Sequence, residues 1–215
     1  MKIAVLTLKT VLDSLLTWVR NDYVYYNTLS TPAPEKSWLY SSFYGNSHGN
    51  CDYYVKAVNM INRTDVDQNK LSTRLMFDTS RANLPTIHIH MPSETPGKFT
   101  ALNGQIGFSG LDDDNNAQMD LARSFGSTYD LIITGGNSEE VILIYELLQA
   151  LFIAGHDTIQ NYFAVFDYAG NELMVNPEII PYNTFYRAFR VSVQDERVVR
   201  SIVATPTVED IYFGG

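Results

Sequence analysis

Two histidines and a carboxylate are the residues of this chain whose types and spacing come nearest to a reactive site. His88 and His90 alternate along an apolar stretch, so a β-strand there would place both imidazoles on one face. Glu94 follows four residues after His90. Two imidazoles and a carboxylate make the facial-triad ligand set of iron and other divalent metals. This trio is the candidate metal site of the sequence.

The spacing of the trio resembles the first motif of the cupins, a family that includes small metal-dependent enzymes. The chain departs from that motif at Ala82, where the family has glycine, and around His156, where a second motif with its own turn is not found. Pro92 also favours a strand end shortly after His90. We therefore expect the histidines to lie on an exposed face or at a contact, without metal or cofactor.

Other catalytic patterns are weaker. Gly135 and Gly136 separate a predicted strand from a predicted helix, where free backbone N–H groups could hold a phosphate. Glu139 and Glu140 would repel it, and no Lys-Ser or Lys-Thr pair follows the glycines. The one cysteine, Cys51, has no neighbouring base in the sequence and is expected to be an inert thiol. We assign no catalytic residue and expect no enzyme.

Composition and charge describe a folded acidic protein. The 215 residues carry 15 Lys and Arg against 24 Asp and Glu, a net charge of −9, and charged residues make up 18%. That fraction lies below the usual ~25%, which leaves a surface that is easy to desolvate in a contact. Lys and Arg are scattered, which argues against tight nucleic-acid binding. We also expect no membrane contact, because no stretch holds the ~18 uninterrupted apolar residues of a membrane span.

Two stretches have the spacing of a long amphipathic helix. Apolar residues recur every three or four positions over about residues 3–21. The second stretch follows Asn137, which stands three residues before Glu140 in a capping box. We expect this helix to begin at about Ser138 and to end at Gly155 in the left-handed conformation.

Short stretches of β-branched and aromatic residues between turn residues predict the strands. They are placed near residues 38–44, 52–60, 72–78, 86–91, 104–108 and 129–134. Two hairpins are expected to follow, 161–167 with 172–175 and 184–194 with 197–205. The prediction is one α+β domain over 1–215, in which two long helices flank a mainly antiparallel sheet.

Two segments are expected to leave the compact body. Residues 22–37 contain two prolines and are predicted to be an extended arm, and residues 109–117, with three adjacent aspartates, a mobile acidic loop. Tyr and Trp are dense in the first quarter of the chain, where they serve either as ordinary strand residues or as a contact surface. The candidate subunit-interface residues are Tyr25, Tyr26, Pro32, Pro34, Trp38, Asp112, Asp113 and Asp114.

The order of the expected elements resembles that of the tail-terminator and tail-completion proteins of tailed bacteriophages. The closest stretch runs from 129–134 through the following helix to 187–193. The resemblance implies a structural protein of the virion neck or tail, assembled in the host cytoplasm, whose copies form a homohexameric ring. It also implies contacts with tail-tube or sheath subunits and with a head-side connector, while DNA passes through the ring without specific binding.

The net charge of −9 suits a subunit around a DNA channel, because negative charge repels the passing phosphates, and it suits plain solubility equally. Two other hypotheses stay open. One is a small cupin-like metal-dependent enzyme that uses His88, His90 and Glu94, and the other is an interaction domain without a viral context. Stoichiometric bound metal would favour the enzyme, and a strict monomer would count against the ring.

Overall fold

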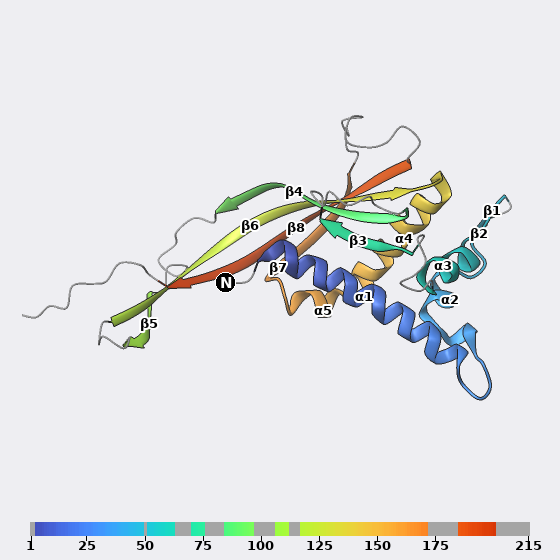
Figure 1. Cartoon of the computed structure of the whole chain (residues 1–215), viewed down its shortest axis with the longest axis horizontal. Helices are drawn as coiled ribbons and strands as arrows, with labels where there is room; N and C mark the ends of the chain where they lie inside the picture. The colour runs from blue at the N-terminus through green and yellow to red at the C-terminus, as the bar shows by residue number, and fades with distance from the viewer. Residues whose placement is uncertain are drawn as a thin grey trace, which may run out of the picture.

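A computed structural model of the chain describes residues 3–49, 51–62, 70–75, 84–96, 106–111, 117–171 and 185–200. Within them, a six-stranded sheet carries helices on one face (Figure 1). The α+β class, with a mainly antiparallel sheet and two long helices, is confirmed.

The sheet has the order β3-β4-β6-β8-β7, and β5 pairs with β6 as a further strand. The strands are β3 (Ser72–Leu75), β4 (Thr86–Pro96), β5 (Ile106–Leu111), β6 (Ala117–Gly135), β7 (Val165–Asn171) and β8 (Phe185–Arg200). β3 is parallel to β4, and the other pairs are antiparallel. β1 (Ser47–His48) and β2 (Cys51–Asp52) form a separate two-stranded ladder.

The two long helices are α1 (Ala4–Asn27) and α4 (Ser138–Ala154). The predicted start of α4 is confirmed, because the Asn137 side chain accepts a hydrogen bond from the Glu140 N–H. Gly155 follows α4 as expected, but its φ of −93° is not left-handed. Its small size matters for another reason: a Cβ there would stand 2.7 Å from the Leu15 Cδ2 atom of α1. α5 (His156–Gln160) comes next.

Two predicted strands in the first third are wrong. Residues 38–44 form helix α2 (Trp38–Phe43), and residues 52–60 lie mostly in α3 (Tyr53–Asn62). The buried side chains have helical spacing: Leu39 and Phe43 in α2, and Ala57, Met60 and Ile61 in α3. Burial of one helical stripe therefore outweighs the strand propensity of the tyrosines and valines.

The extended arm at 22–37 is also corrected. Residues up to Asn27 continue α1, and a 3-10 turn, η1 (Pro34–Lys36), precedes α2. The chain folds back on α1, because the Trp38 N–H donates to the Asp22 carboxylate at 2.7 Å. These contacts make a reversal between two helices, not an outward arm.

The C-terminal hairpins are replaced by two unbroken strands. β7 runs through 168–171 and β8 runs through 195–196, where turns were expected. Both strands pair with a neighbour across these positions. Part of the expected acidic loop, Ser109 to Leu111, belongs to β5, and Ala117 begins β6. The remainder of that loop, 112–116, lies outside the described residues.

Candidate functional site

The structure separates the predicted metal trio. His88 and His90 lie in β4 on the face opposite the buried Ile87 and Ile89, and both are half-buried. The pairing of β4 with β6 shifts between His90 and Ser93, so His90 lies opposite Asp130 while Glu94 lies opposite Ser127.

This shift moves Glu94 to the other face of the sheet, because paired residues share a face and successive residues alternate. The Ser127 hydroxyl, on that face, donates to the Glu94 carboxylate at 3.5 Å. No group of three His, Cys, Asp or Glu able to hold a metal is found among the described residues, which include the trio. The arrangement does not provide the facial triad that the sequence spacing suggested.

An ion pair next to His90 was not anticipated from the sequence. Asp130 of β6 is 1% exposed, and Arg190 of β8 donates two hydrogen bonds to it, at 2.9 Å from Nε and 3.2 Å from Nη2. The pair raises the pKa of Arg190 above its ordinary value, chiefly through these hydrogen bonds. The signal was present in the sequence, since Asp130 is the single charge of the apolar stretch 129–134, and a buried carboxylate requires a partner.

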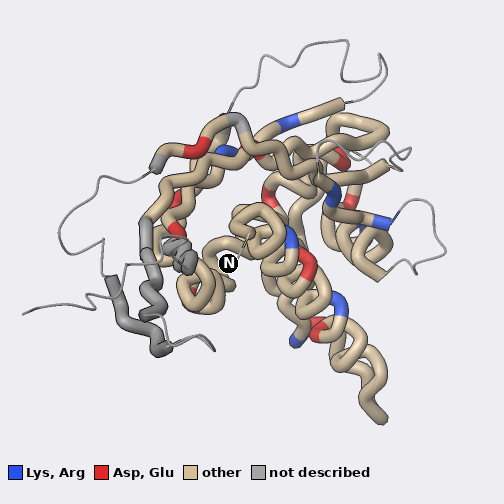
Figure 2. Tube along the Cα trace, turned by 60° about the vertical axis from the view of Figure 1, so that its left-hand side comes forward, with Lys and Arg blue, Asp and Glu red and all other residues tan. Residues whose placement is uncertain are grey.

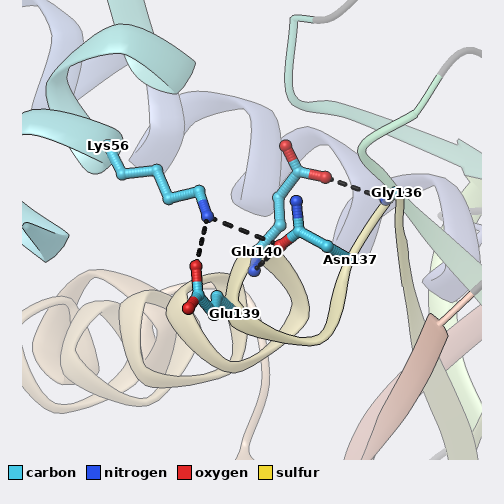
Figure 3. Close-up of polar contacts among 5 residues, drawn as sticks. All are labelled: Lys56, Gly136, Asn137, Glu139 and Glu140. Carbon is cyan, nitrogen blue, oxygen red and sulfur yellow. Dashed lines mark hydrogen bonds and ion pairs between the residues drawn. The ribbon is translucent and has the colours of Figure 1, made fainter. Parts of the chain in front are cut away.

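The turn at the start of α4 holds its own polar groups (Figure 3). The Gly136 N–H donates to the Glu140 carboxylate at 2.9 Å, and the Glu140 N–H donates to the Asn137 Oδ1 atom at 2.8 Å. Two of the donors that a phosphate would use, the N–H groups of Gly136 and Glu140, are therefore engaged by the chain itself. Lys56 of α3 adds an ion pair to Glu139 at 3.1 Å and a 3.4 Å hydrogen bond to Asn137, which ties α3 to α4.

Cys51 lies beside this cluster, in a shallow hollow lined by Asp52, Val55 and Glu139 among others. The thiol is half-buried, and burial raises its pKa, with a further rise from a hydrogen bond to Glu139. An activated cysteine needs the opposite shift, toward the thiolate. This direction favours the protonated thiol, and the inertness of Cys51 stays a prediction.

Five tyrosines belong to the end of α1, to α2 and its C-cap, and to the first turn of α3, helices that contact one another at one end of the molecule (Figure 1). Tyr40 and Tyr44 are stacked with ring centroids 4.0 Å apart, and Tyr54 packs edge-on against both. Tyr25 and Tyr26 of α1 form a second pair at 5.1 Å. We call these five tyrosines the aromatic end.

The aromatic end is open to solvent in places. Tyr44 is 63% exposed and Tyr25 is 60% exposed. A hydrogen bond with Tyr44, followed by burial, raises the pKa of Tyr40 to about 12. Large exposed aromatic groups mark contact surfaces, because they bury much apolar area at a small cost in side-chain entropy.

The other candidate interface residues have different surroundings. Trp38 is half-buried and packs edge-on against Trp18 and Phe43, so it belongs to the core margin. Pro32 is exposed in the turn after α1, whereas Pro34 begins η1 and is half-buried. Asp112, Asp113 and Asp114 lie outside the described residues.

At the opposite end, β6 and β8 extend past the helices as a long ribbon (Figure 1). They stay paired from Asp120 with Arg200 to Gly135 with Phe185, and β5 pairs with the far end of β6. We call this three-stranded extension, residues 106–111, 117–124 and 196–200, the ribbon. Charged residues in the described part of the chain are scattered along the elements, not gathered into one patch (Figure 2).

Among the described helices, none has the length and apolarity needed to cross a bilayer. No model of a known protein family matches the chain, and a search of curated proteins found no relative.

Proposed function

We propose that this chain is a structural subunit that assembles with identical copies. The observation that carries the proposal is the placement of two contact-prone features at opposite ends of an elongated molecule: the aromatic end and the ribbon (Figure 1). A contact between unlike surfaces of neighbouring copies is heterologous, and it closes into a ring when the rotation between copies allows. The two ends fit such a head-to-tail contact.

The more specific proposal is a tail-terminator or tail-completion subunit that forms a ring, hexameric by the resemblance, at the neck of a tailed bacteriophage. Its support is the part of the resembling element order that the structure keeps, which is strand 129–134, helix α4 and strand 187–193. The arm and the two hairpins of that order are not kept. The ring would join the head-side connector to the tail tube or sheath and let DNA pass. The net charge of −9 suits such a passage.

The test compares assembly of the wild-type chain with a variant of the aromatic end. Purified protein, alone and mixed with tail tubes that lack their terminator, is examined by negative-stain electron microscopy and native mass spectrometry. Wild type is expected to form rings that sit at one end of the tubes, and the Tyr25→Ser, Tyr44→Ser variant is not. Tyr186→Ser is the control, because Tyr186 is an exposed tyrosine of β8 outside the aromatic end.

Each outcome decides one part of the proposal. Rings that ignore tail tubes would contradict the phage assignment and favour a non-viral interaction domain. Wild type that stays monomeric at high concentration, with and without tubes, would overturn the assembly proposal as a whole. Rings that survive the double substitution would exclude the aromatic end as the contact.

A further inference from the structure

Helix α4 runs beside α2 and α3 (Figure 1), and residues of these three helices, together with Asn46, line a hollow of about 360 Å³. We call it the α4 hollow. Two of its lining residues, Phe43 of α2 and Leu143 of α4, are buried and form an apolar base. Small-molecule sites in proteins have volumes of about 300–1,000 Å³ and join apolar walls with a few polar groups. The α4 hollow therefore has the size of a ligand site.

The α4 side of the hollow carries one negative charge between two apolar residues. Ile142, Glu146 and Ala150 are spaced four residues apart, so they lie on one face of α4, and all three line the hollow. Glu146 is exposed, and it is the only charged residue of α4 after the first turn. Among the described residues, none forms a hydrogen bond or an ion pair with its carboxylate. The other lining residues are uncharged, so Glu146 sets the charge of the hollow.

The side formed by α2 and α3 supplies aromatic rings and two neutral polar groups. Phe43 and the half-buried Tyr53 both line the hollow. The Asn46 N–H donates to the Phe43 carbonyl at 3.2 Å, and the Tyr53 N–H donates to the Asn46 carbonyl at 3.1 Å, which fixes the backbone between the rings. The Asn46 side chain donates to the Ser42 carbonyl through Nδ2 at 3.4 Å, so the acceptor that it offers is Oδ1. With the Ser42 hydroxyl, this side adds two oxygen acceptors to the carboxylate on α4.

We propose that the α4 hollow binds a primary alkylammonium group. An ammonium group has three donors, which match the Glu146 carboxylate, the Ser42 hydroxyl and the Asn46 amide oxygen. The alkyl chain contacts the apolar base, and the aromatic rings attract the cation to their negatively polarised faces. The carboxylate repels anions, and no Lys or Arg of the described chain lines the hollow to offset it. The charge of the site thus selects a cation.

Two other hollows that are formed by described residues differ in their charges. In the hollow beside Cys51, Lys56 and Glu139 pair with each other at 3.1 Å. The remaining carboxylate there, Asp52, accepts a hydrogen bond from the N–H of a residue in the first turn of α3. The hollow between α1 and α5 is lined by no charged residue. Neither hollow therefore offers an unengaged carboxylate next to an apolar base.

The first experiment compares a charged ligand with its uncharged counterpart. Pentylammonium and 1-pentanol carry the same alkyl chain, and NMR titration at low salt measures the dissociation constant of each. Wild type is expected to bind pentylammonium at about 1 mM, which lies within the affinity limit for a ligand of about six heavy atoms, and pentanol at least about threefold more weakly. Glu146→Gln should weaken pentylammonium binding about three- to fivefold, as expected for a partly exposed ion pair, and leave pentanol binding unchanged.

Glu35→Gln is the matched control, because Glu35 is an exposed glutamate of η1 that does not line the hollow. It should leave both dissociation constants unchanged. Three results would each overturn the proposal: pentanol that binds as tightly as pentylammonium, equal binding of pentylammonium by wild type and Glu146→Gln, or a wild type that binds no pentylammonium in the millimolar range.

The second experiment locates the site. Ala150→Leu places a larger side chain in the α4 hollow and should abolish binding of both ligands. Ala154→Leu is the control, because it makes the same change in α4 at a residue that lines the hollow between α1 and α5. Far-ultraviolet circular dichroism and the melting temperature establish that each variant is folded, and Glu146→Gln, a change at an exposed position, decides the question if Ala150→Leu unfolds. Pentylammonium binding that survives Ala150→Leu, or that is lost equally in Ala154→Leu, would exclude the α4 hollow.

An alkylammonium group occurs both in free amines and in the lysine side chains of other proteins. Nα-acetyl-lysine amide is therefore titrated beside pentylammonium. Tighter binding of the lysine derivative assigns the site to a lysine of a partner protein, and tighter binding of pentylammonium assigns it to a free amine.

This site does not depend on the proposed ring, whose contact uses the aromatic end. Loss of amine binding in Glu146→Gln would leave ring assembly intact. Loss of rings in the Tyr25→Ser, Tyr44→Ser variant would likewise leave amine binding intact.

Discussion

Gly155 is the position at which the packing of α4 on α1 is most directly tested. An added Cβ would stand 2.7 Å from Leu15 Cδ2 and 2.9 Å from the Leu151 carbonyl oxygen. Leu15 is 8% exposed, so its side chain has little room to move, and the carbonyl belongs to the last turn of α4. We therefore expect Gly155→Ala to force α4 away from α1.

Two opposing effects set the magnitude. A φ of −93° is open to alanine, so the substitution gains about 0.4–1 kcal/mol by restricting the unfolded chain. Overpacking costs about 1–3 kcal/mol, and a backbone atom among the close contacts favours the upper part of that range. The net loss of unfolding free energy is expected to be about 1–2 kcal/mol. In a chain of this length the melting temperature should fall by about 2–8 °C.

Gly136→Ala provides the control, because its Cβ would meet nothing closer than the Glu140 carboxylate at 3.6 Å. Differential scanning calorimetry and urea unfolding of both variants measure the difference. Leu15→Ala in the Gly155→Ala background should be less destabilising than the sum of the single changes by about 1 kcal/mol, because the new methyl group fills vacated space. A Gly155→Ala variant as stable as Gly136→Ala would refute the close packing.

Three further predictions concern local polar groups. Asn137→Ala should lower the unfolding free energy by about 1 kcal/mol in urea titrations, because α4 loses its N-terminal cap. Tyr44→Phe should lower the pKa of Tyr40 from about 12, seen as phenolate absorbance appearing at lower pH. Because that pKa is raised on folding, the stability that it contributes is complete below the ordinary tyrosine pKa and is lost as the pH rises through about 12. Lys56→Met should lower stability at neutral pH only slightly, since the pair with Glu139 is partly exposed. Hydrogen bonds from Lys56 and Cys51 lower the pKa of Glu139. The difference in stability between Lys56→Met and wild type should therefore vanish as the pH falls from the ordinary value of 4.5 through the lowered pKa. A stability difference that does not change in acid unfolding would refute this prediction.

The parts of the fold that were predicted correctly carry local signals. α4 combines an apolar helical stripe with an N-cap and a glycine after its last turn, so both its start and its end follow from neighbouring residues. The strand predicted at 129–134 is the C-terminal part of β6, where buried side chains alternate on the helix face and a glycine pair follows; the first half of β6, from Ala117, was not predicted. In both cases the signals that fix the element lie within it or beside it.

The errors arise where local and long-range effects compete. α2 and α3 contain several aromatic residues, which favour strands, yet Ser37 and Asp52 cap them and their buried residues repeat with helical spacing. The shift that separates His90 from Glu94 depends on the pairing of β4 with β6 and leaves no mark in the sequence of β4 alone. The candidate metal trio therefore failed for a reason that only strand register could reveal.

The position of the ribbon explains why β8 was predicted as a hairpin, and it is also a physical reason to expect a partner surface. Strands that are covered by a helix layer alternate apolar and polar residues. The ribbon lies past that layer and needs no such alternation. Because the alternation stops there, the charged residues 195–196 were predicted to be a turn although β8 continues through them. Two or three strands without a covering layer are marginal in water. We therefore expect the ribbon to gain stability by contact with another surface, and the exposed tyrosines of the aromatic end are one surface that the chain itself offers.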